Sequence, residues 1–223
     1  MIKAIVFDFD GTLTNGELFD YRALSDFFKP YFPDKEGIEF EAIIQDLNKA
    51  DIYATGPMNF ANRCKSFIKK YGISDETVDK LMEYWETDVY KYSVLREGAK
   101  EVLEKLKKKY KLGILTNGGV ERQYNKVKTA GIYDLIDGMT VSAEIGATKP
   151  DRRMYESVCQ KLGVNFSECV FVGDSFSGDI LGAYRCGMVP VWYTKDMDKP
   201  GGSQVRKIHD LNEIFDILKE VEG

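Results

Sequence analysis

Ala4-Ile-Val-Phe7, followed directly by Asp8-Phe9-Asp10-Gly11-Thr12-Leu13-Thr14, is the stretch of sequence that decides the fold. The apolar run is short and continuous and ends at a glycine-containing segment, which is typical of a strand buried on both faces of a sheet. Two carboxylates follow it at once. Ligands of open α/β sheets bind beyond the carboxyl ends of the strands. The sequence therefore places its first candidate chemistry at Asp8 and Asp10.

The rest of the chain alternates between strand and helix patterns. Further buried-strand runs recur at Lys111–Leu115, Met139–Ser142, Cys169–Val172 and Met188–Trp192. Segments with helical periodicity separate or follow them, at Gly98–Tyr110, Val120–Ala130, Asp151–Leu162, Ser177–Cys186 and Asp210–Val221. This alternation predicts an α/β fold with a Rossmann-like, mainly parallel sheet.

The stretch from residue 17 to residue 92 interrupts that alternation just after the first strand. It has no convincing strand pattern, and its periodicity predicts helices near Tyr21–Phe32, Glu39–Tyr53, Asn59–Tyr71 and Asp75–Tyr92. We therefore predict two domains. Residues 1–16 and 93–223 form an α/β core, and residues 17–92 form a helical insert.

The overall charge and composition exclude several classes of protein. The chain has 223 residues, a formal net charge of −5 and a sequence pI of about 5.2. Nucleic acids and anionic membranes attract proteins with a basic surface, so neither is an expected partner. Nothing in the sequence indicates an obligate protein partner. An anionic substrate must therefore be attracted by local groups.

Residue usage also narrows the location and the chemistry. The first apolar run is too short for a signal peptide or a membrane span, which favours a cytoplasmic protein. The four cysteines, Cys64, Cys159, Cys169 and Cys186, are scattered and are interpreted as reduced and buried. His209 is the only histidine, which argues against His-based zinc sites and Ser-His-Asp triads.

The carboxylates of Asp8 and Asp10 can point the same way if the segment is extended. Two like charges held together are costly unless a cation or a shared proton offsets them. The functional interpretation is a metal-bound pair in which one carboxylate is a nucleophile and the other an acid/base. The alternative is an ordinary turn rich in Asp and Gly.

Two further motifs have features suited to phosphate. Thr116-Asn117-Gly118-Gly119 follows a predicted strand and opens a helix, where backbone N–H groups and side-chain donors meet an anion; the alternative is plain N-capping. Lys149-Pro150-Asp151 places Pro150 in the first turn of a predicted helix and a lysine just before it. That lysine is either a counter-charge for phosphate or an ordinary surface residue.

The last motif, Gly173-Asp174-Ser175-Phe176-Ser177-Gly178-Asp179, again follows a buried strand. Mg²⁺ prefers one or two carboxylates together with waters and substrate oxygens, and Asp174 is the better candidate ligand. Asp179 would orient a water or Lys149, or it would simply favour a helix N-terminus.

Together, and in this order, the motifs resemble those of the haloacid-dehalogenase-like (HAD) phosphohydrolases over the whole chain. Asp8 and Asp10 are similar to the first family motif, Thr116-Asn117 to the second, Lys149 to the third, and Asp174 with Asp179 to the fourth. The helical insert resembles the family's α-helical cap. Gln123 and Lys126 downstream of Thr116 resemble the branch with pyrimidine nucleotidases and N-acylneuraminate phosphatases.

The resemblance implies a role for each matching residue. Asp8 would attack phosphorus and become an aspartyl-phosphate, and Asp10 would serve as general acid and then base. Mg²⁺ would be held by Asp8, the backbone carbonyl of Asp10, and Asp174. The phosphoryl oxygens would be bound by Thr116, Asn117 and Lys149. The supporting residues would be Gly11, Thr12, Gly118, Ser175 and Asp179.

The expected activity is hydrolysis of a small phosphorylated metabolite, such as a nucleotide or a sugar phosphate. An acid at position 10 favours phosphoryl chemistry over dehalogenation, since the family's dehalogenases lack one there. A phosphomutase of the same family uses the same two aspartates and stays open. A non-catalytic phospho-acceptor signalling module also stays open, although such modules are shorter and have no helical insert. Aromatic residues of the insert are more often core than substrate contacts.

Overall fold

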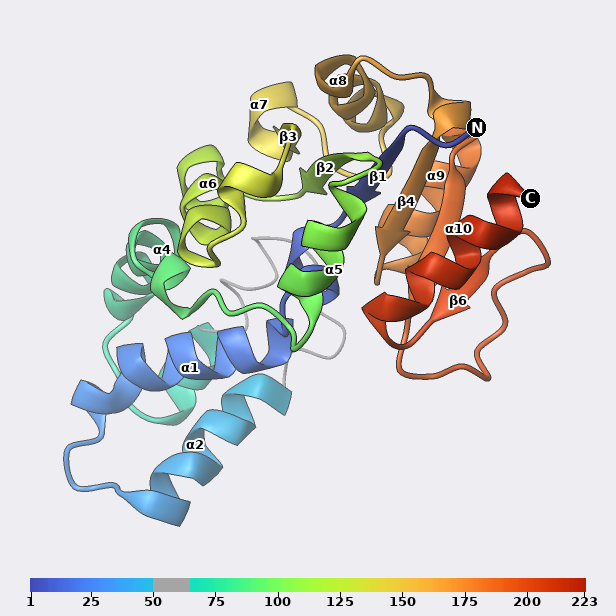
Figure 1. Cartoon of the computed structure of the whole chain (residues 1–223). Coiled ribbons are helices and arrows are strands. Elements are labelled where there is room, and N and C mark those ends of the chain that lie inside the picture. Colours follow the sequence, from blue (N-terminus) through green and yellow to red (C-terminus); the bar gives the residue numbers. More distant parts are fainter. Residues whose placement is uncertain (50–64) are drawn as a thin grey trace. The chain divides into compact units, whose positions relative to one another are not determined.

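The computed structural model describes residues 1–49 and 65–223. Within them the strands form one six-stranded sheet in the order β3-β2-β1-β4-β5-β6 (Figure 1). Every pairing in the sheet is parallel. The strands are β1 (Ala4–Phe7), β2 (Lys111–Thr116), β3 (Gly138–Val141), β4 (Cys169–Gly173), β5 (Val189–Tyr193) and β6 (Arg206–Ile208). The predicted Rossmann-like α/β class is confirmed, because this is the strand order of a doubly wound sheet.

The register brings three of the motifs to one edge of the sheet. Phe7, the last residue of β1, pairs with Ile114 of β2 on one side and with Val172 of β4 on the other. The carboxyl ends of these three strands therefore lie next to one another. The chain reverses its winding direction at β1, and such a switch point opens a crevice for ligands.

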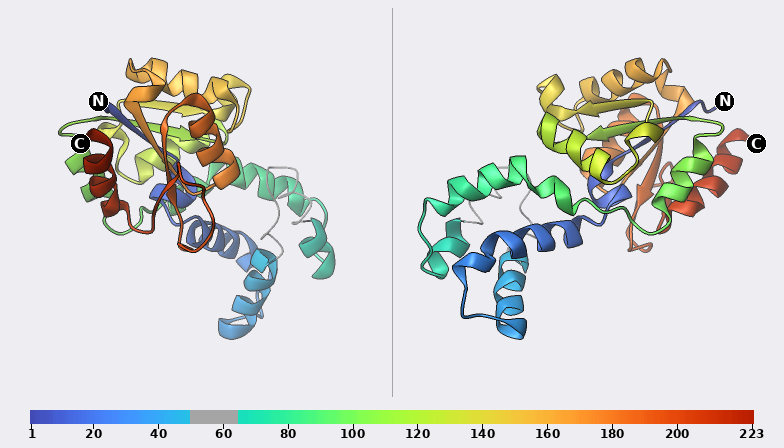
Figure 2. Two further views of the ribbon diagram at one scale, coloured as in Figure 1. Left: turned by 90° about the vertical axis from the view of Figure 1, so that its right-hand side faces the viewer. Right: turned by 60° about the vertical axis from the view of Figure 1, so that its left-hand side comes forward.

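Both faces of the sheet are covered by helices, as Figure 2 shows. Ile5 and Phe7 belong to the core beneath one set of helices, and Ala4 and Val6 to the core beneath the other. The first set is α5 (Ala99–Leu106), α6 (Val120–Thr129) and α10 (Ile214–Glu222). The second set is α8 (Arg152–Leu162) and α9 (Leu181–Cys186). A strand buried on both sides explains why β1 is apolar at every position.

The structure differs from the predicted elements in several places. The strand β6 was not predicted, because two of its three residues, Arg206 and Lys207, are charged and the strand lies at an edge of the sheet. Ser142 begins a short helix, α7 (Ser142–Ile145), and does not end a strand. The helix predicted from Ser177 starts only at Leu181, after a π-helical turn, η6 (Phe176–Ile180).

Other short 3₁₀ segments lie between the main elements of this part of the chain. They are η4 (Tyr133–Leu135), η5 (Phe166–Glu168) and η7 (Leu211–Glu213). The last of these precedes α10, so the helix predicted from Asp210 begins as a 3₁₀ turn capped by the Asp210 side chain. Capping by a carboxylate satisfies N–H groups that a helix start leaves open.

The chain divides into two compact units, Met1–Gly16 with Ser93–Gly223, and Glu17–Tyr92. The second unit has its own core, which includes Leu24, Phe28 and Leu81. Its described elements are α1 (Gly16–Phe28), η2 (Lys29–Tyr31), α2 (Gly37–Lys49), a helical stretch at residues 65–70, α4 (Thr77–Thr87) and η3 (Val89–Tyr92). Parts of the helices predicted at Glu39–Tyr53 and Asn59–Tyr71 lie outside the described residues. The role of this unit as a cap stays a prediction.

Two sequence-level expectations concern the chain as a whole. Over residues 1–49 and 65–223, no helix is both long enough and apolar enough to cross a membrane. Cys159, Cys169 and Cys186 are buried and unbridged, as expected for reduced core thiols, whereas Cys64 lies outside the described residues.

Candidate active site

The turn after β1 carries Asp8 and Asp10 and is not extended. Phe9–Leu13 forms a π-helical turn, η1, with breaks in helical geometry at Asp10 and Gly11. Phe9 and Leu13 are buried in the core and anchor the turn. Asp8 and Asp10 therefore line the same pocket from a tight turn. The prediction that an extended segment carries both carboxylates is wrong.

Gly11 is required at its position for two reasons. Its φ of 90° lies in the left-handed region that disfavours other residues. A Cβ at Gly11 would also overlap the carboxylate of Asp174. From outside the turn, the guanidinium of Arg96 donates hydrogen bonds to the carbonyls of Gly11 and Thr12. Arg96 therefore fixes the backbone that presents Asp10.

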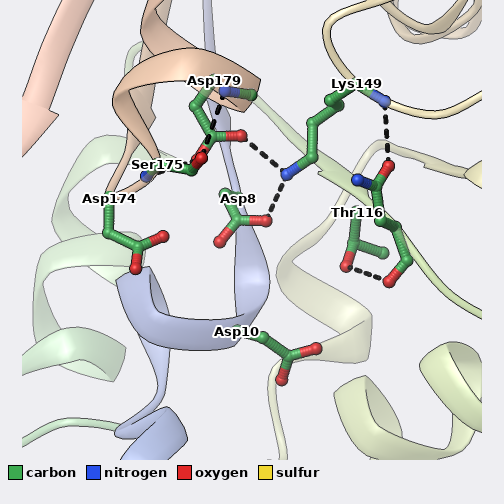
Figure 3. Close-up of a pocket in the computed structure, with 9 residues that line it drawn as sticks. Asp8, Asp10, Thr116, Lys149, Asp174, Ser175 and Asp179 are labelled. Carbon is green, nitrogen blue, oxygen red and sulfur yellow. Dashed lines mark hydrogen bonds and ion pairs between the residues drawn. The ribbon is translucent and has the colours of Figure 1, made fainter. Parts of the chain in front are cut away.

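A pocket of about 280 Å³ opens at the carboxyl ends of β1, β2 and β4 (Figure 3). Most of the residues singled out by sequence motifs line it. They are Asp8, Asp10, Thr116, Asn117, Lys149, Asp174, Ser175 and Asp179, together with Gly178. The lining is therefore rich in carboxylates and contains one buried ammonium group.

Lys149 lies between two carboxylates in the floor of the pocket. Its ammonium group forms ion pairs with Asp8 Oδ1 and, at 2.7 Å, with Asp179 Oδ1. All three side chains are buried. Lys149 is therefore not a surface lysine. Pro150 does not begin the following helix either, because α8 starts at Arg152 with Asp151 as its N-cap.

This burial changes the acidity of the groups. Burial, together with the nearby carboxylates of Asp179 and Asp174, raises the pKa of Asp8 well above its ordinary value, against the attraction of Lys149. Burial alone would lower the pKa of Lys149, but the carboxylates of Asp179 and Asp8 raise it overall. Lys149 therefore stays charged, and its ammonium group is the main source of positive charge in the pocket floor.

The carboxylates fit a hard divalent cation. One oxygen each from Asp8, Asp174 and Asp179 lie within 4.8 Å of one another. Asp8 Oδ2 is buried and has no hydrogen-bond partner among the described residues. Desolvation in the pocket and repulsion by Asp179 raise the pKa of Asp174 to about 6. A cation bound here would offset the like charges and would use the free oxygen of Asp8.

The remaining residues of the fourth motif shape the loop that carries Asp174. Asp179 Oδ2 accepts a hydrogen bond from Ser175 N at 3.0 Å, and Ser175 Oγ accepts one from Gly178 N. Thr12 Oγ1 lies 3.4 Å from Asp174 Oδ1. Asp179 is fully buried and contacts Lys149, so it is not merely a charge placed at the exposed start of a helix.

The loop after β2 faces the opposite side of the pocket. The helix α6 that follows is capped by Gly119 and has no side-chain cap, so Thr116 and Asn117 are not its N-caps. Asn117 Oδ1 accepts a hydrogen bond from the backbone N–H of Lys149 at 3.0 Å. Gly118 N donates to Ser142 Oγ at 2.8 Å. The first bond joins the second motif to the third, and the second bond joins the second motif to the start of α7.

Asp10 has different surroundings from Asp8. Its carboxylate forms an ion pair with Lys126 and accepts a hydrogen bond from Gln123 Nε2 at 2.9 Å. Burial would raise the pKa of Asp10, but the Lys126 charge and the bonds from Lys126 and Gln123 lower it overall. Asp8 and Asp10, only two residues apart, therefore have pKa values shifted in opposite directions. Such a contrast is common where two carboxyls take different roles.

The sequence predicted most of the pocket residues and several supporting ones, of which Ser175 and Asp179 line the pocket themselves. The other three, Gly11, Thr12 and Gly118, do not line the pocket. They contact residues of the neighbouring loops, Asp174 for the first two and Ser142 for Gly118. The contacts of Gln123 and Lys126 with Asp10 were not predicted, although their spacing of three on a helix after the second motif places them on one face. Arg96 carries no signal in the sequence, since its partners are backbone carbonyls distant in the chain.

A comparison with protein families identifies the family of the chain. A family model described as haloacid dehalogenase-like hydrolase matches residues 2–187. The chain belongs to this family of hydrolases, and the resemblance drawn from the four motifs is confirmed.

Two of the similar proteins within this comparison are named as phosphatases. Glyceraldehyde 3-phosphate phosphatase of Methanocaldococcus jannaschii is 29% identical over 228 residues, covering 100% of this chain and 99% of the relative. N-acylneuraminate-9-phosphatase of Rattus norvegicus is 31% identical over 117 residues, covering 52% of this chain and 47% of the relative. The family and these names confirm the predicted class of enzyme, a phosphoric monoester hydrolase.

A solved structure supports the fold. The HAD-hydrolase YfnB from Bacillus subtilis, bound to magnesium, superposes with a TM-score of 0.77 at 22% identity, covering 97% of this chain and 98% of that one. At this identity the likeness concerns the fold alone.

Proposed function

We propose that this chain is a Mg²⁺-dependent phosphatase that hydrolyses a small phosphomonoester through an aspartyl-phosphate on Asp8. The observation that carries the proposal is the position of Asp8. It lies at the carboxyl end of the central strand, one oxygen contacts Lys149, and the other is buried without a hydrogen-bond partner. A carboxylate oxygen left unbonded in a pocket is available to attack or to bind a cation.

The phosphoryl group would be held by positive charge and hydrogen-bond donors. Lys149 supplies the charge, and it is already fixed by Asp179 and by its backbone bond to Asn117. Thr116 and Asn117 line the same pocket. Donors that are fixed before the reaction stabilise the charge on the transferring phosphoryl group without reorganising, which is the largest effect in this kind of catalysis.

Asp10 would move the proton. In the first displacement it protonates the leaving oxygen, and in the second it accepts a proton from the water that cleaves the aspartyl-phosphate. The pKa of Asp10 is lowered here, which favours the carboxylate needed for the second step. An incoming phosphate anion favours the protonated form needed for the first.

The cation would be held by Asp8 and Asp174, together with the backbone carbonyl of Asp10. When bound, Mg²⁺ neutralises the like charges of the cluster and the charge of the phosphoryl oxygens. The carboxylate cluster of Asp8, Asp174 and Asp179 supports this assignment. The magnesium named for YfnB is consistent with it.

A phosphorylated sugar of small size is the substrate class we propose. The relative that matches the full length of the chain is named for glyceraldehyde 3-phosphate, and the one matching half of it is named for a phosphorylated N-acylneuraminate. The Glu17–Tyr92 unit would serve as the cap that selects this sugar. A small metabolite fits the cytoplasmic location expected from the sequence, which stays a prediction.

The test is phosphate release with Mg²⁺ from triose phosphates, hexose phosphates, nucleoside monophosphates and p-nitrophenyl phosphate, with Asp8→Asn as the blank. Release from a sugar phosphate by the wild type and not by the variant is the expected result. Conversion of a sugar phosphate to its isomer, dependent on a bisphosphate and without release, would indicate a mutase. No turnover of any substrate would contradict the proposal.

A further inference from the structure

Two side chains of α6 hold the carboxylate of Asp10. Lys126 Nζ forms an ion pair with Asp10 Oδ1, and Gln123 Nε2 donates to Asp10 Oδ2 at 2.9 Å. Both oxygens of Asp10 are therefore bound by one helix. Residues three apart lie on the same helical face, so the two contacts reinforce one orientation of the carboxylate.

Gln123 makes a second bond into the pocket. Its Nε2 lies 2.6 Å from Thr116 Oγ1, to which it donates. An amide group has two hydrogens, and here one is directed to Asp10 and one to Thr116. Because Thr116 Oγ1 accepts this bond, its own hydrogen is left for another acceptor. The Thr116 hydroxyl donates to Asn117 O at 3.5 Å, which is the long limit of a hydrogen bond.

The side chains of Gln123 and Lys126 are polar and lie in the interior of the protein, where burial of polar groups is unfavourable. Gln123 is fully buried and Lys126 is 4% exposed. The Lys126 ammonium also lies 5.8 Å from the centroid of the buried Phe9 ring. Burying a charge and an amide N–H group is unfavourable without partners, and Asp10 and Thr116 supply partners for the Lys126 ammonium and the Gln123 amide N–H groups.

The bound Asp10 carboxylate lies on the pocket side of α6. In Figure 3 it points away from the Asp8–Lys149 pair, although both carboxylates line the pocket. A carboxylate without these bonds would be free to rotate toward other groups. The acid/base and the nucleophile are therefore kept apart by contacts that come from α6 and not from the motif that contains them.

We propose that Gln123 and Lys126 are positioning residues, Lys126 for the acid/base Asp10, and Gln123 for both Asp10 and the phosphate-binding hydroxyl of Thr116. The inference rests on the proposed phosphatase function. In the first displacement, the bond from Asp8 to phosphorus forms while the bond to the leaving oxygen breaks, and the proton of Asp10 passes to that oxygen. Lys126 acts on the proton transfer through Asp10, whereas Gln123 acts also on the phosphoryl group through Thr116.

The leaving group separates these two effects. A sugar alkoxide is a poor leaving group and needs the proton of Asp10, whereas a dinitrophenolate leaves without it. The ratio kcat/KM reports the steps up to formation of the aspartyl-phosphate, where the leaving group departs. Loss of Asp10 positioning therefore lowers kcat/KM for a sugar phosphate and spares 2,4-dinitrophenyl phosphate.

The experiment measures kcat/KM for both substrates in the wild type and in Lys126→Met, Lys126→Arg, Gln123→Met and Lys128→Met. We expect Lys126→Met to lose about tenfold or more on the sugar phosphate and little on dinitrophenyl phosphate. Lys126→Arg, which keeps the charge, restores part of the loss. Gln123→Met loses activity on both substrates. Lys128 is exposed on the same helix, so Lys128→Met matches the wild type.

The ratio of the two activities within one preparation does not depend on the folded fraction, so poor folding of Lys126→Met leaves its test valid. For Gln123→Met the two activities are compared per folded protein, with the folded fraction measured by thermal unfolding. An unchanged ratio in Lys126→Met, with an active wild type, overturns the positioning role of Lys126 and leaves the proposed function intact. Selective loss on the sugar phosphate in Gln123→Met overturns its role at Thr116. Absence of turnover by the wild type on both substrates overturns the proposed function and this inference with it.

Discussion

Lys149 Nζ lies 2.7 Å from Asp179 Oδ1, in a buried ion pair that leaves the same ammonium group in contact with Asp8. Asp179 is itself held by the backbone N–H of Ser175. The position of the lysine is therefore set by the loop after β4, and the candidate nucleophile is paired with a charge already fixed by another residue.

Removing that charge should destabilise the protein. In Lys149→Met, Asp8 and Asp179 would be buried without a counter-charge, which typically costs about 3–5 kcal/mol. We expect a matching loss in the free energy of unfolding, measured by urea denaturation without Mg²⁺, and loss of turnover. The double variant Lys149→Met with Asp179→Asn should recover part of the stability and none of the activity. Equal stability of Lys149→Met and the wild type would contradict the buried pair.

Replacement of the candidate nucleophile should separate activity from folding. Asp8→Asn keeps the size of the side chain but removes the attacking oxygen, so turnover should fall by at least about a thousandfold. The fold should persist, because the ion pair of Lys149 with Asp179 remains. The readouts are phosphate release and thermal unfolding. Asp134→Asn, at an exposed aspartate away from the pocket, serves as the control. Turnover near the wild-type rate would remove Asp8 as the nucleophile.

Mg²⁺ should stabilise the wild type and not Asp174→Asn. The wild type should be inactive in EDTA and regain activity with Mg²⁺, with an unfolding temperature that rises with Mg²⁺ concentration. The variant loses a carboxylate from a like-charged cluster, so without metal it should be at least as stable as the wild type. Differential scanning fluorimetry across a Mg²⁺ series compares the two. An equal rise in both proteins would place the cation elsewhere.

The affinity for Mg²⁺ should weaken as the pH falls. Desolvation in the pocket and repulsion by Asp179 raise the pKa of Asp174 to about 6, and burial raises that of Asp8 well above its ordinary value. Protons compete with the cation for both carboxylates, so affinity should fall below about pH 6 and become constant well above it. The stability of the metal-free protein should change in the opposite direction to the Mg²⁺ affinity. A raised folded-state pKa means that the metal-free fold gains stability from Asp174 as the pH falls from about 7 toward 4.

Calorimetric titration with Mg²⁺ between pH 5 and pH 8 measures the first effect, and the heat in buffers of different ionisation enthalpy counts the protons released. Constant affinity over this range would contradict the raised pKa values. Urea denaturation of the metal-free protein over the same range measures the second.

Gly11→Ala should damage the metal site more than the fold. The new Cβ would overlap the Asp174 carboxylate and would also occupy a backbone position with a φ of 90°. The backbone effect alone costs about 1 kcal/mol. Gly146→Ala is the matched control, because Gly146 has a φ of 65° but open space around its Cβ position. Both variants should lose similar stability, and only Gly11→Ala should need more Mg²⁺ for half-maximal activity. Equal Mg²⁺ requirements would contradict the close approach to Asp174.

The central part of the fold was predictable because its strands have clear local sequence patterns. The strands β1, β2 and β4 are continuous apolar runs that end at polar motifs, so their existence and the edge at which their residues meet could be inferred from the sequence. The strand β6 could not, because Arg206-Lys-Ile208 becomes a strand by pairing with β5 and has little strand signal of its own.

The site was predictable as a set of residues but not as a set of contacts. Asp8 and Lys149 follow from motifs, but their pairing is set by the docking of α8 and the loop before it. The π-helical turn at Phe9–Leu13 depends on Gly11 packing against Asp174, which is distant in sequence. The roles assigned to the pocket residues stay predictions until the variants are measured.

The sheet order also has a consequence for the order of events at the ribosome. The strand β1 is synthesised first, yet its two neighbours begin at Lys111 and Cys169. Emerging chains fold as their partners become available, and pairings between distant segments form slowly. The candidate nucleophile is therefore translated long before the other residues of its pocket, and β1 has neither of its paired neighbours until β2 leaves the exit tunnel.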